Sequence, residues 1–171
     1  MAAILVTVGM AAYQFDRLLT AVVPLCAYHD VFAQTGVSAV IPPCPNAAYV
    51  PLDEFQRRLT EADIVLTHAG GTVRLVQRSG RLPLVVPRSF RRGEAPDDSQ
   101  TAYLRAEESA GRAHAVWDVD RLAEAVSGHH RRALREPLAP PVSDQALVTT
   151  MEALVARLLA TRPAAGRRGP G

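Results

Sequence analysis

A pair of glycines after an apolar run is the segment of this sequence best suited to chemistry. The run Ile64–Thr67 is followed by His68 and then by the triplet Gly70-Gly71-Thr72. Because glycine has no β-carbon, backbone N–H groups at such a turn can approach a phosphate closely, and a threonine at a helix start adds a hydroxyl. The segment predicts a phosphate-binding turn, with an ordinary tight turn as the alternative.

Two further loops could meet this turn. Gly9 follows the apolar run Ile4–Val8, and Thr35 follows the shorter run Val31–Gln34. In an open parallel sheet the carboxyl ends of the strands lie at one edge, where ligands bind and helix N-termini present unpaired amides. We therefore expect the three loops to converge on one site.

The elements that must position these loops alternate between strands and helices. Short apolar runs predict strands, and apolar residues at helical spacing predict the helices between them. Alternation of this kind implies right-handed crossovers, so we predict an α/β fold with a Rossmann-like, doubly wound parallel sheet. The predicted strands are 4–8, 31–34, 48–50, 64–67, 84–86 and 114–117, and the predicted helices are 15–23, 51–59, 72–78, 97–106 and 119–126.

Length and composition indicate one domain. The 171 residues are 48% hydrophobic and 21% charged, which is enough apolar material for a single core. We place a ligand-binding α/β domain at residues 1–128 and a connection containing Pro and Arg at 129–144. A C-terminal helix is expected at 145–162, because its apolar residues form a stripe, and a disordered tail at 163–171.

Several functional classes are disfavoured by what the sequence lacks. It contains no lysine, which excludes the Gly-Lys-Ser/Thr phosphate loop, and no Gly-x-Gly-x-x-Gly follows a strand. A nucleotide-sugar epimerase or dehydrogenase would need that fingerprint and a Tyr/Lys pair. The arginine pairs have no interleaved aromatic residues, so nucleic-acid binding is not expected.

Two further expectations concern metal binding and location. Cys26 and Cys44 show no metal-site spacing, so we expect no metal. No apolar run is long enough to cross a bilayer, so we expect a cytoplasmic protein.

Taken in order, the motifs resemble a known family. The chain resembles the C-terminal domain of family 28 glycosyltransferases, and in particular the small donor-binding subunits of two-part N-acetylglucosaminyltransferases and exopolysaccharide glycosyltransferases. The resemblance covers residues 4–126. The matching segments are Ile4–Gly9 with Phe15–Leu18, Gln34–Gly36, Ala62–Gly70, and Gly80–Arg88 with Gly93-Glu94 and Asp97–Gln100.

This resemblance implies both a fold and a function. The fold would be equivalent to the C-terminal half of a GT-B glycosyltransferase, and the ligand a nucleotide-diphosphate sugar, usually a UDP-sugar, bound without a cofactor or metal. The donor-binding residues implied are Gly9, Thr35, His68, Gly70, Gly71, Thr72, Glu94, Asp98 and Gln100. Transfer to an acceptor would need a membrane-associated partner subunit that holds the acceptor and supplies the catalytic base, and that recruits this chain to the membrane.

Three positions depart from the family pattern. Met10 stands where the family commonly has threonine, and Ser99 replaces a histidine before Gln100. Leu75 falls near the position where many relatives place a glutamate that binds the ribose, and its side chain cannot accept hydrogen bonds from ribose hydroxyls. A non-catalytic auxiliary or scaffold subunit of a glycosyltransferase complex is therefore the alternative function.

Other polar and aromatic residues are given structural roles. Asp16 and Arg17 are expected to pair or to be solvated on the first helix. His129 and His130, beside two arginines, are expected in solvent. Trp117 ends a short apolar strand and is expected in the core.

Overall fold

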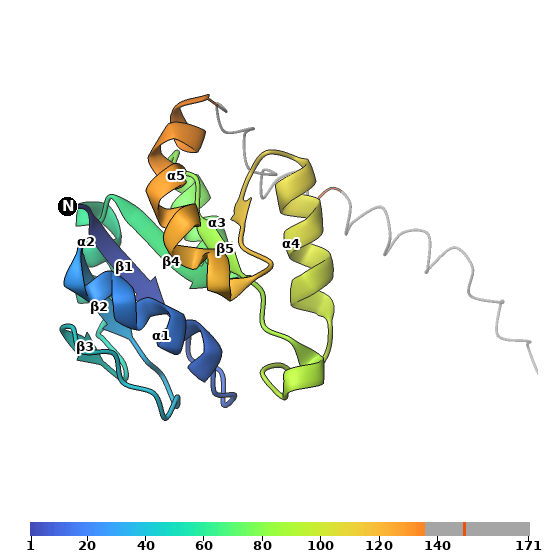
Figure 1. Ribbon diagram of the computed structural model, residues 1–171. Coiled ribbons are helices and arrows are strands. Elements are labelled where there is room, and N and C mark those ends of the chain that lie inside the picture. The colour runs from blue at the N-terminus through green and yellow to red at the C-terminus, as the bar shows by residue number, and fades with distance from the viewer. Residues whose placement is uncertain (136–148, 150–171) are drawn as a thin grey trace, which may run out of the picture. The chain divides into compact units, whose positions relative to one another are not determined.

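A six-stranded sheet forms the centre of the described chain (Figure 1). The computed structural model describes residues 1–135 and Thr149. Neighbouring strands pair in parallel in the order β3-β2-β1-β4-β5-β6, which confirms the predicted Rossmann-like α/β fold. The strands are β1 (Ala3–Thr7), β2 (Asp30–Gln34), β3 (Asn46–Ala47), β4 (Ile64–His68), β5 (Leu84–Val86) and β6 (His114–Ala115).

The strand order reverses between β1 and β4. The chain proceeds from β1 to β2 and β3 on one side, then crosses so that β4 pairs with the other side of β1. Thr7 is paired in register with Thr67, so β1 and β4 end at the same level of the sheet. Ligands of open α/β sheets bind beyond the carboxyl ends of the strands at such a switch point. The loops after β1 and β4 flank it.

Helices cover both faces of the sheet. The helix α1 packs with α5 on one face, and α2, α3 and α4 pack on the other (Figure 1). The α-helices are α1 (Asp16–Val22), α2 (Leu52–Glu61), α3 (Gly71–Arg78), α4 (Ser99–Ser109) and α5 (Leu122–Arg135), and the 3₁₀ helices are η1 (Val23–Ala27), η2 (Phe90–Arg92) and η3 (Val119–Arg121).

Burial on both faces explains why β1 reads as an unbroken apolar run. Ile4 and Val6 contact the cluster formed with α1 and α5, whereas Leu5 belongs to the cluster beneath α2 and α3. All three side chains are at most 2% exposed. A strand covered on both faces needs apolar residues at every position, as is usual in parallel sheets.

Two predicted boundaries were wrong. The third strand is Asn46–Ala47 instead of 48–50, because those two residues pair with Ala33 and Gln34 at the end of β2. Helix α5 continues to Arg135, so residues 129–135 are helical instead of part of a connection. Three expected segments lie outside the described residues: the rest of the connection, the C-terminal helix 145–162 and the tail 163–171. Thr149 is the exception.

His129 is buried, which corrects the expectation that it is solvated; His130 is exposed as expected. Leu122, Val126 and His129 recur at helical spacing along the buried side of α5. The Nε2–H group of His129 donates to the carbonyl of Leu82 at 3.1 Å, because a carbonyl can only accept. Its Nδ1 lies 3.0 Å from Nδ1 of His114, with the two rings nearly coplanar at 2°. The neutral pair thus requires His114 to donate and His129 to accept.

Trp117 also differs from expectation, since it is 42% exposed instead of in the core. Its indole Nε1–H donates to Glu108 at 2.9 Å, and the Arg105 guanidinium lies over the ring. The tryptophan follows β6, which is an edge strand of the sheet within residues 1–135. The thiols of Cys26 and Cys44 are both free.

Candidate functional site

The imidazole of His68 lies at the carboxyl end of β4, enclosed by glycines from two loops. Gly9 follows β1 with a φ of +76°, and Gly70 follows β4. A β-carbon at either glycine would collide with the imidazole ring of His68. The sequence assigned Gly70 to close approach of a phosphate. The structure shows that Gly9 and Gly70 make room for the histidine.

Gly71 occupies a different environment. A β-carbon placed there would meet nothing within 4 Å, so the backbone of Gly71 is open to a ligand. It begins α3, whose N-cap residue Gly70 is extended and provides no side-chain cap. The first N–H groups of a helix have no intrahelical acceptor, and the helix dipole makes this end positive. Gly71 and the half-buried Thr72 thus place an uncapped helix start beside His68, an arrangement that suits an anion.

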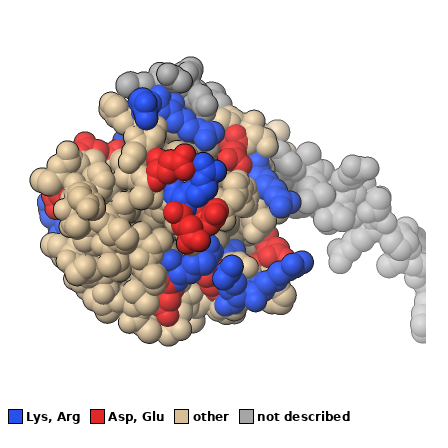
Figure 2. Space-filling view, viewed as in Figure 1, with Lys and Arg blue, Asp and Glu red and all other residues tan. Residues whose placement is uncertain are grey.

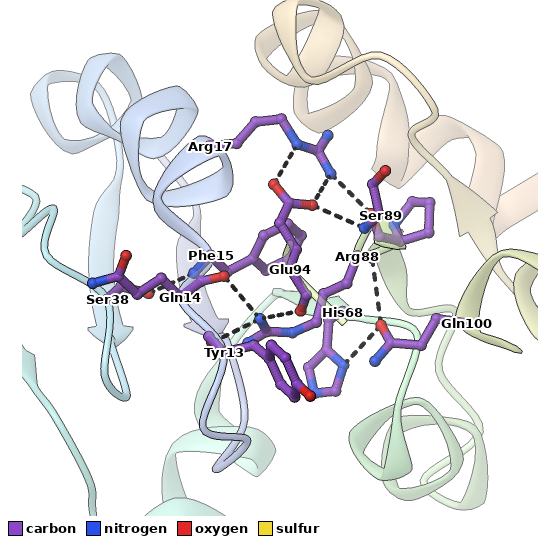
Figure 3. A network of polar contacts seen from close by, with 11 residues as sticks. Tyr13, Gln14, Phe15, Arg17, Ser38, His68, Arg88, Ser89, Glu94 and Gln100 are labelled. Carbon is purple, nitrogen blue, oxygen red and sulfur yellow. Dashed lines mark hydrogen bonds and ion pairs between the residues drawn. The ribbon is translucent and has the colours of Figure 1, made fainter. Parts of the chain in front are cut away.

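Gln100 joins this group from the first turn of α4. Its Oε1 lies 3.3 Å from Nδ1 of His68 and accepts the backbone N–H of Arg88 at 3.4 Å (Figure 3). Burial, together with the positive charge of Arg88, lowers the pKa of His68 from 6.5 to about 4, and the bond to Gln100 opposes these effects. The imidazole is therefore neutral at pH ~7.

Arg88 is a buried residue that the sequence motifs did not single out as functional. It follows β5, is 1% exposed, and stacks its guanidinium over the ring of Phe15. The guanidinium donates to the carbonyls of Val8, Tyr13, Gln14 and Glu94 at 2.7–3.1 Å. This side chain ties the loop after β1 to the loop after β5, so both loops are fixed relative to His68. An arginine directly after an apolar strand run could have indicated Arg88, because a charge buried at a strand end requires partners.

Glu94 contributes its carboxylate to the same network. Arg17 donates to its Oε1 at 2.9 Å and to its Oε2 at 2.8 Å, and the backbone N–H of Ser89 donates to Oε2 at 2.9 Å. Glu94 is 6% exposed, so these partners occupy a buried carboxylate. Arg17 therefore pairs across to the β5 loop, and Asp16 accepts the N–H groups of Ala39 and Val40. The sequence had suggested that Asp16 and Arg17 pair with each other or are solvated. The structure shows that each has a different protein partner instead.

The other predicted site residues lie at the margin. Thr35, in the loop that follows β2, is 2% exposed. Its hydroxyl lies 3.5 Å from the carbonyl of Ala47 in β3. Asp98 is exposed at the start of α4 and makes no side-chain cap. The structure thus brings together Gly9, His68, Gly70 and Gln100, with Gly71 and Thr72 beside them.

Charge on the face formed by α1 and α5 is mixed. Basic side chains lie next to acidic ones on this face (Figure 2). Within residues 1–135 and Thr149, no group of three His, Cys, Asp or Glu side chains is arranged to hold a metal ion. The same residues include no helix that is long and apolar enough to span a membrane.

Comparison with solved structures gives a structural likeness. No protein-family model matches the sequence, and no curated protein matches it. Among solved structures, the chain is similar to the crystal structure of CalG4, the calicheamicin glycosyltransferase, with a TM-score of 0.49 and 18% sequence identity. The match covers 95% of this chain and 44% of CalG4, so the chain spans less than half the length of that structure.

Proposed function

We propose that this chain is the donor-binding subunit of a glycosyltransferase and binds a nucleotide-diphosphate sugar, most simply a UDP-sugar, at the carboxyl ends of β1 and β4. One observation carries the proposal: the uncapped N-terminus of α3 lies beside His68 and Gln100 at the topological switch point. Such an end provides unpaired N–H groups and positive potential for a diphosphate. The ordered motif set that resembles family 28 enzymes supports the same ligand.

The arrangement suits departure of a diphosphate without a metal. The N–H groups of Gly71 and Thr72 would bind the phosphate oxygens on which negative charge increases as the bond to the sugar breaks. Gln100 uses its Oε1 within the protein, which directs its Nε2 amide to a ligand hydroxyl or phosphate. The buried Arg88 and Glu94 would act as positioning residues for these loops. A membrane-associated partner would hold the acceptor and supply the base that removes its proton.

The first prediction concerns Gly71. We expect Gly71→Ala to weaken binding of UDP and UDP-sugars at least about tenfold, because the added methyl group stands where the diphosphate would approach the backbone. Folding should not suffer, since no protein atom lies within 4 Å of that methyl group. Isothermal titration calorimetry measures the affinity, and urea unfolding measures the stability.

Gly128→Ala is the matched control for this experiment. Gly128 lies in α5, and a β-carbon there also meets nothing within 4 Å. This variant should bind as the unmodified protein does. Equal affinities for the two variants would contradict the proposed diphosphate position, and absence of binding by the unmodified protein would contradict the function.

Leu75 favours a second candidate, a non-catalytic subunit that stabilises another transferase. Its side chain is 40% exposed and lies one helical turn after Gly71, on the same side of α3. A leucine there offers no acceptor for ribose hydroxyls. We expect Leu75→Glu to tighten UDP binding about fivefold or more, through hydrogen bonds to a charged acceptor. A 2′,3′-dideoxy UDP should show no gain, and an equal gain for both nucleotides would exclude ribose recognition at this position.

A further inference from the structure

Trp117 is held in a fixed position at the surface. It is the only tryptophan of the chain and is 42% exposed. Its indole N–H donates to Glu108 at 2.9 Å, and the guanidinium of Arg105 lies 5.8 Å from the ring centroid, within the roughly 6 Å reach of a cation–π contact. These contacts fix the orientation of the ring, so a large apolar surface faces solvent in an ordered position.

Two cavities adjoin at this residue. Trp117 and Asp118 line both, and the cavity volumes of about 410 and about 460 Å³ are typical of small-molecule sites. We name the two together the Trp117 groove. The loops after β5 and β6 form the first cavity, whose lining includes Arg17, Ser89, Arg92, Thr101 and Asp120. β6 and α5 form the second, whose lining includes His114, Arg121 and Glu124. Arg105 and Glu108 line neither cavity, so the contacts that hold the ring leave both cavities accessible.

The Trp117 groove is separate from the proposed donor site. Neither cavity is lined by His68, Gly71 or Gln100. Arg88 lines the first cavity, and its backbone N–H donates to Gln100. Thr101, which also lines this cavity, directly follows Gln100 in α4. A ligand in the groove would therefore lie next to the donor site and outside it.

The charges along the first cavity favour a neutral ligand over a phosphate. The guanidinium of Arg17 is paired with a carboxylate, and that of Arg88 is bonded to backbone carbonyls. Arg92, Asp118 and Asp120 line the same cavity, and within residues 1–135 none of the three forms an ion pair. Two carboxylates beside one guanidinium give these groups a net negative charge, which repels an anion.

The exposed groups of the groove match the chemistry of a saccharide. Oδ1 of Asp118 accepts the backbone N–H of Asp120 at 3.1 Å, so Oδ2 can accept from a ligand. Carboxylates accept hydrogen bonds from hydroxyl groups, and the guanidinium of Arg92 donates to them. A pyranose ring also has faces made of C–H groups, which pack on an apolar indole surface. The groove combines both kinds of contact.

We propose that the Trp117 groove binds a neutral oligosaccharide. One sugar ring stacks on the indole, and hydroxyl groups bond to Asp118, Asp120 and Arg92. Because each cavity alone has the volume of a small-molecule site, the groove takes at least two neighbouring sugar units, one in each cavity. This site goes beyond the proposed donor function, since it binds a saccharide that carries no nucleotide.

Fluorescence of the full chain tests the proposal, because all tryptophan emission comes from Trp117. The probes are cellotetraose, maltotetraose and tetra-N-acetylchitotetraose, which are neutral and differ in linkage and substituents. We expect a saturable change in emission with at least one of them, and the same affinity at a saturating concentration of UDP. Tetragalacturonate carries a carboxylate on each ring and should bind at least about tenfold more weakly than that glycan.

Three variants locate the site. Trp117→Ala should weaken binding of the responding glycan at least about tenfold in titration calorimetry, because the stacking surface is lost. Asp120→Ala should weaken it about threefold or more through a lost hydrogen bond, and its exposed side chain is not needed for folding. Tyr28→Ala is the matched control, since Tyr28 is 74% exposed and lines neither cavity. All three variants should bind UDP as the unmodified protein does.

The outcomes separate this inference from the proposed donor function. Absence of a response to all three neutral glycans overturns the inference, and the titrations with UDP-sugars still decide the donor function. Competition between glycan and UDP, or equal glycan affinities of Trp117→Ala and the unmodified protein, would place the saccharide elsewhere and also overturn it. Tighter binding of tetragalacturonate would overturn the neutral ligand. Glycan binding by a protein that binds no UDP-sugar would support the inference and contradict the donor function.

Discussion

Replacing Arg88 by methionine is expected to lower the free energy of unfolding by about 4 kcal/mol, because the change leaves several buried acceptors without a donor. The guanidinium donates to four backbone carbonyls, two of which belong to Tyr13 and Glu94, and it also packs on Phe15. Methionine can fill much of the volume but cannot donate a hydrogen bond. Urea unfolding monitored by circular dichroism measures the loss.

Arg91→Met is the control for this measurement. Arg91 lies three residues further along the chain, in η2, and is exposed, so its replacement should change the free energy of unfolding by less than about 0.5 kcal/mol. Arg88→Lys should recover only part of the loss, since an ammonium group has fewer donors and does not match the fork of the guanidinium. A stability for Arg88→Met equal to that of Arg91→Met would show that the buried network does not hold the loops together.

Acidification is expected to destabilise the fold through the buried pair of His114 and His129. Burial, together with His114 and Arg132, lowers the pKa of His129 from 6.5 to about 4, and the bond to Leu82 opposes these effects. Burial likewise lowers the pKa of His114 to about 4. Between pH 6.5 and about 4 the unfolded chain binds more protons than the folded one. The contribution of the pair to stability is therefore fully present above pH 6.5 and declines as the pH falls toward 4.

His129 alone should account for a loss of about 2 kcal/mol between pH ~7 and ~5. Urea unfolding at a series of pH values gives the slope, to which His68 contributes in the same direction. His129→Phe should have a shallower slope, because phenylalanine fills the site and does not titrate. His130→Gln, at an exposed position on the same helix, should retain the original slope. A slope for His129→Phe as steep as that of the unmodified protein would show that the buried pair does not produce the effect.

The class of fold could be predicted from the sequence because local patterns determine it. Apolar runs that are buried on both faces, such as Ile64–Thr67, differ from the amphipathic stripes that form helices. Glycine after a strand and before a helical stripe marks the turn at Gly70, since backbone freedom is needed there. The end of α5 was missed because His129 is polar. Its spacing from Val126 was helical, but its burial depends on the partner His114, which belongs to strand β6.

The sequence by itself determined the order of the strands and helices and the three loops that end at one edge of the sheet. Only the tertiary structure decided how these loops are held. Arg88 is bonded to carbonyls 74 to 80 residues away, and Glu94 to an arginine 77 residues away, and no local spacing encodes such contacts. The sequence predicted that both glycines of the turn allow a phosphate to approach the backbone. In the structure Gly70 makes room for His68, and Gly71 is the glycine with open space beside it. The reason is physical: sterics and periodicity act between near neighbours, whereas buried charge and polar groups must find partners wherever the fold brings them.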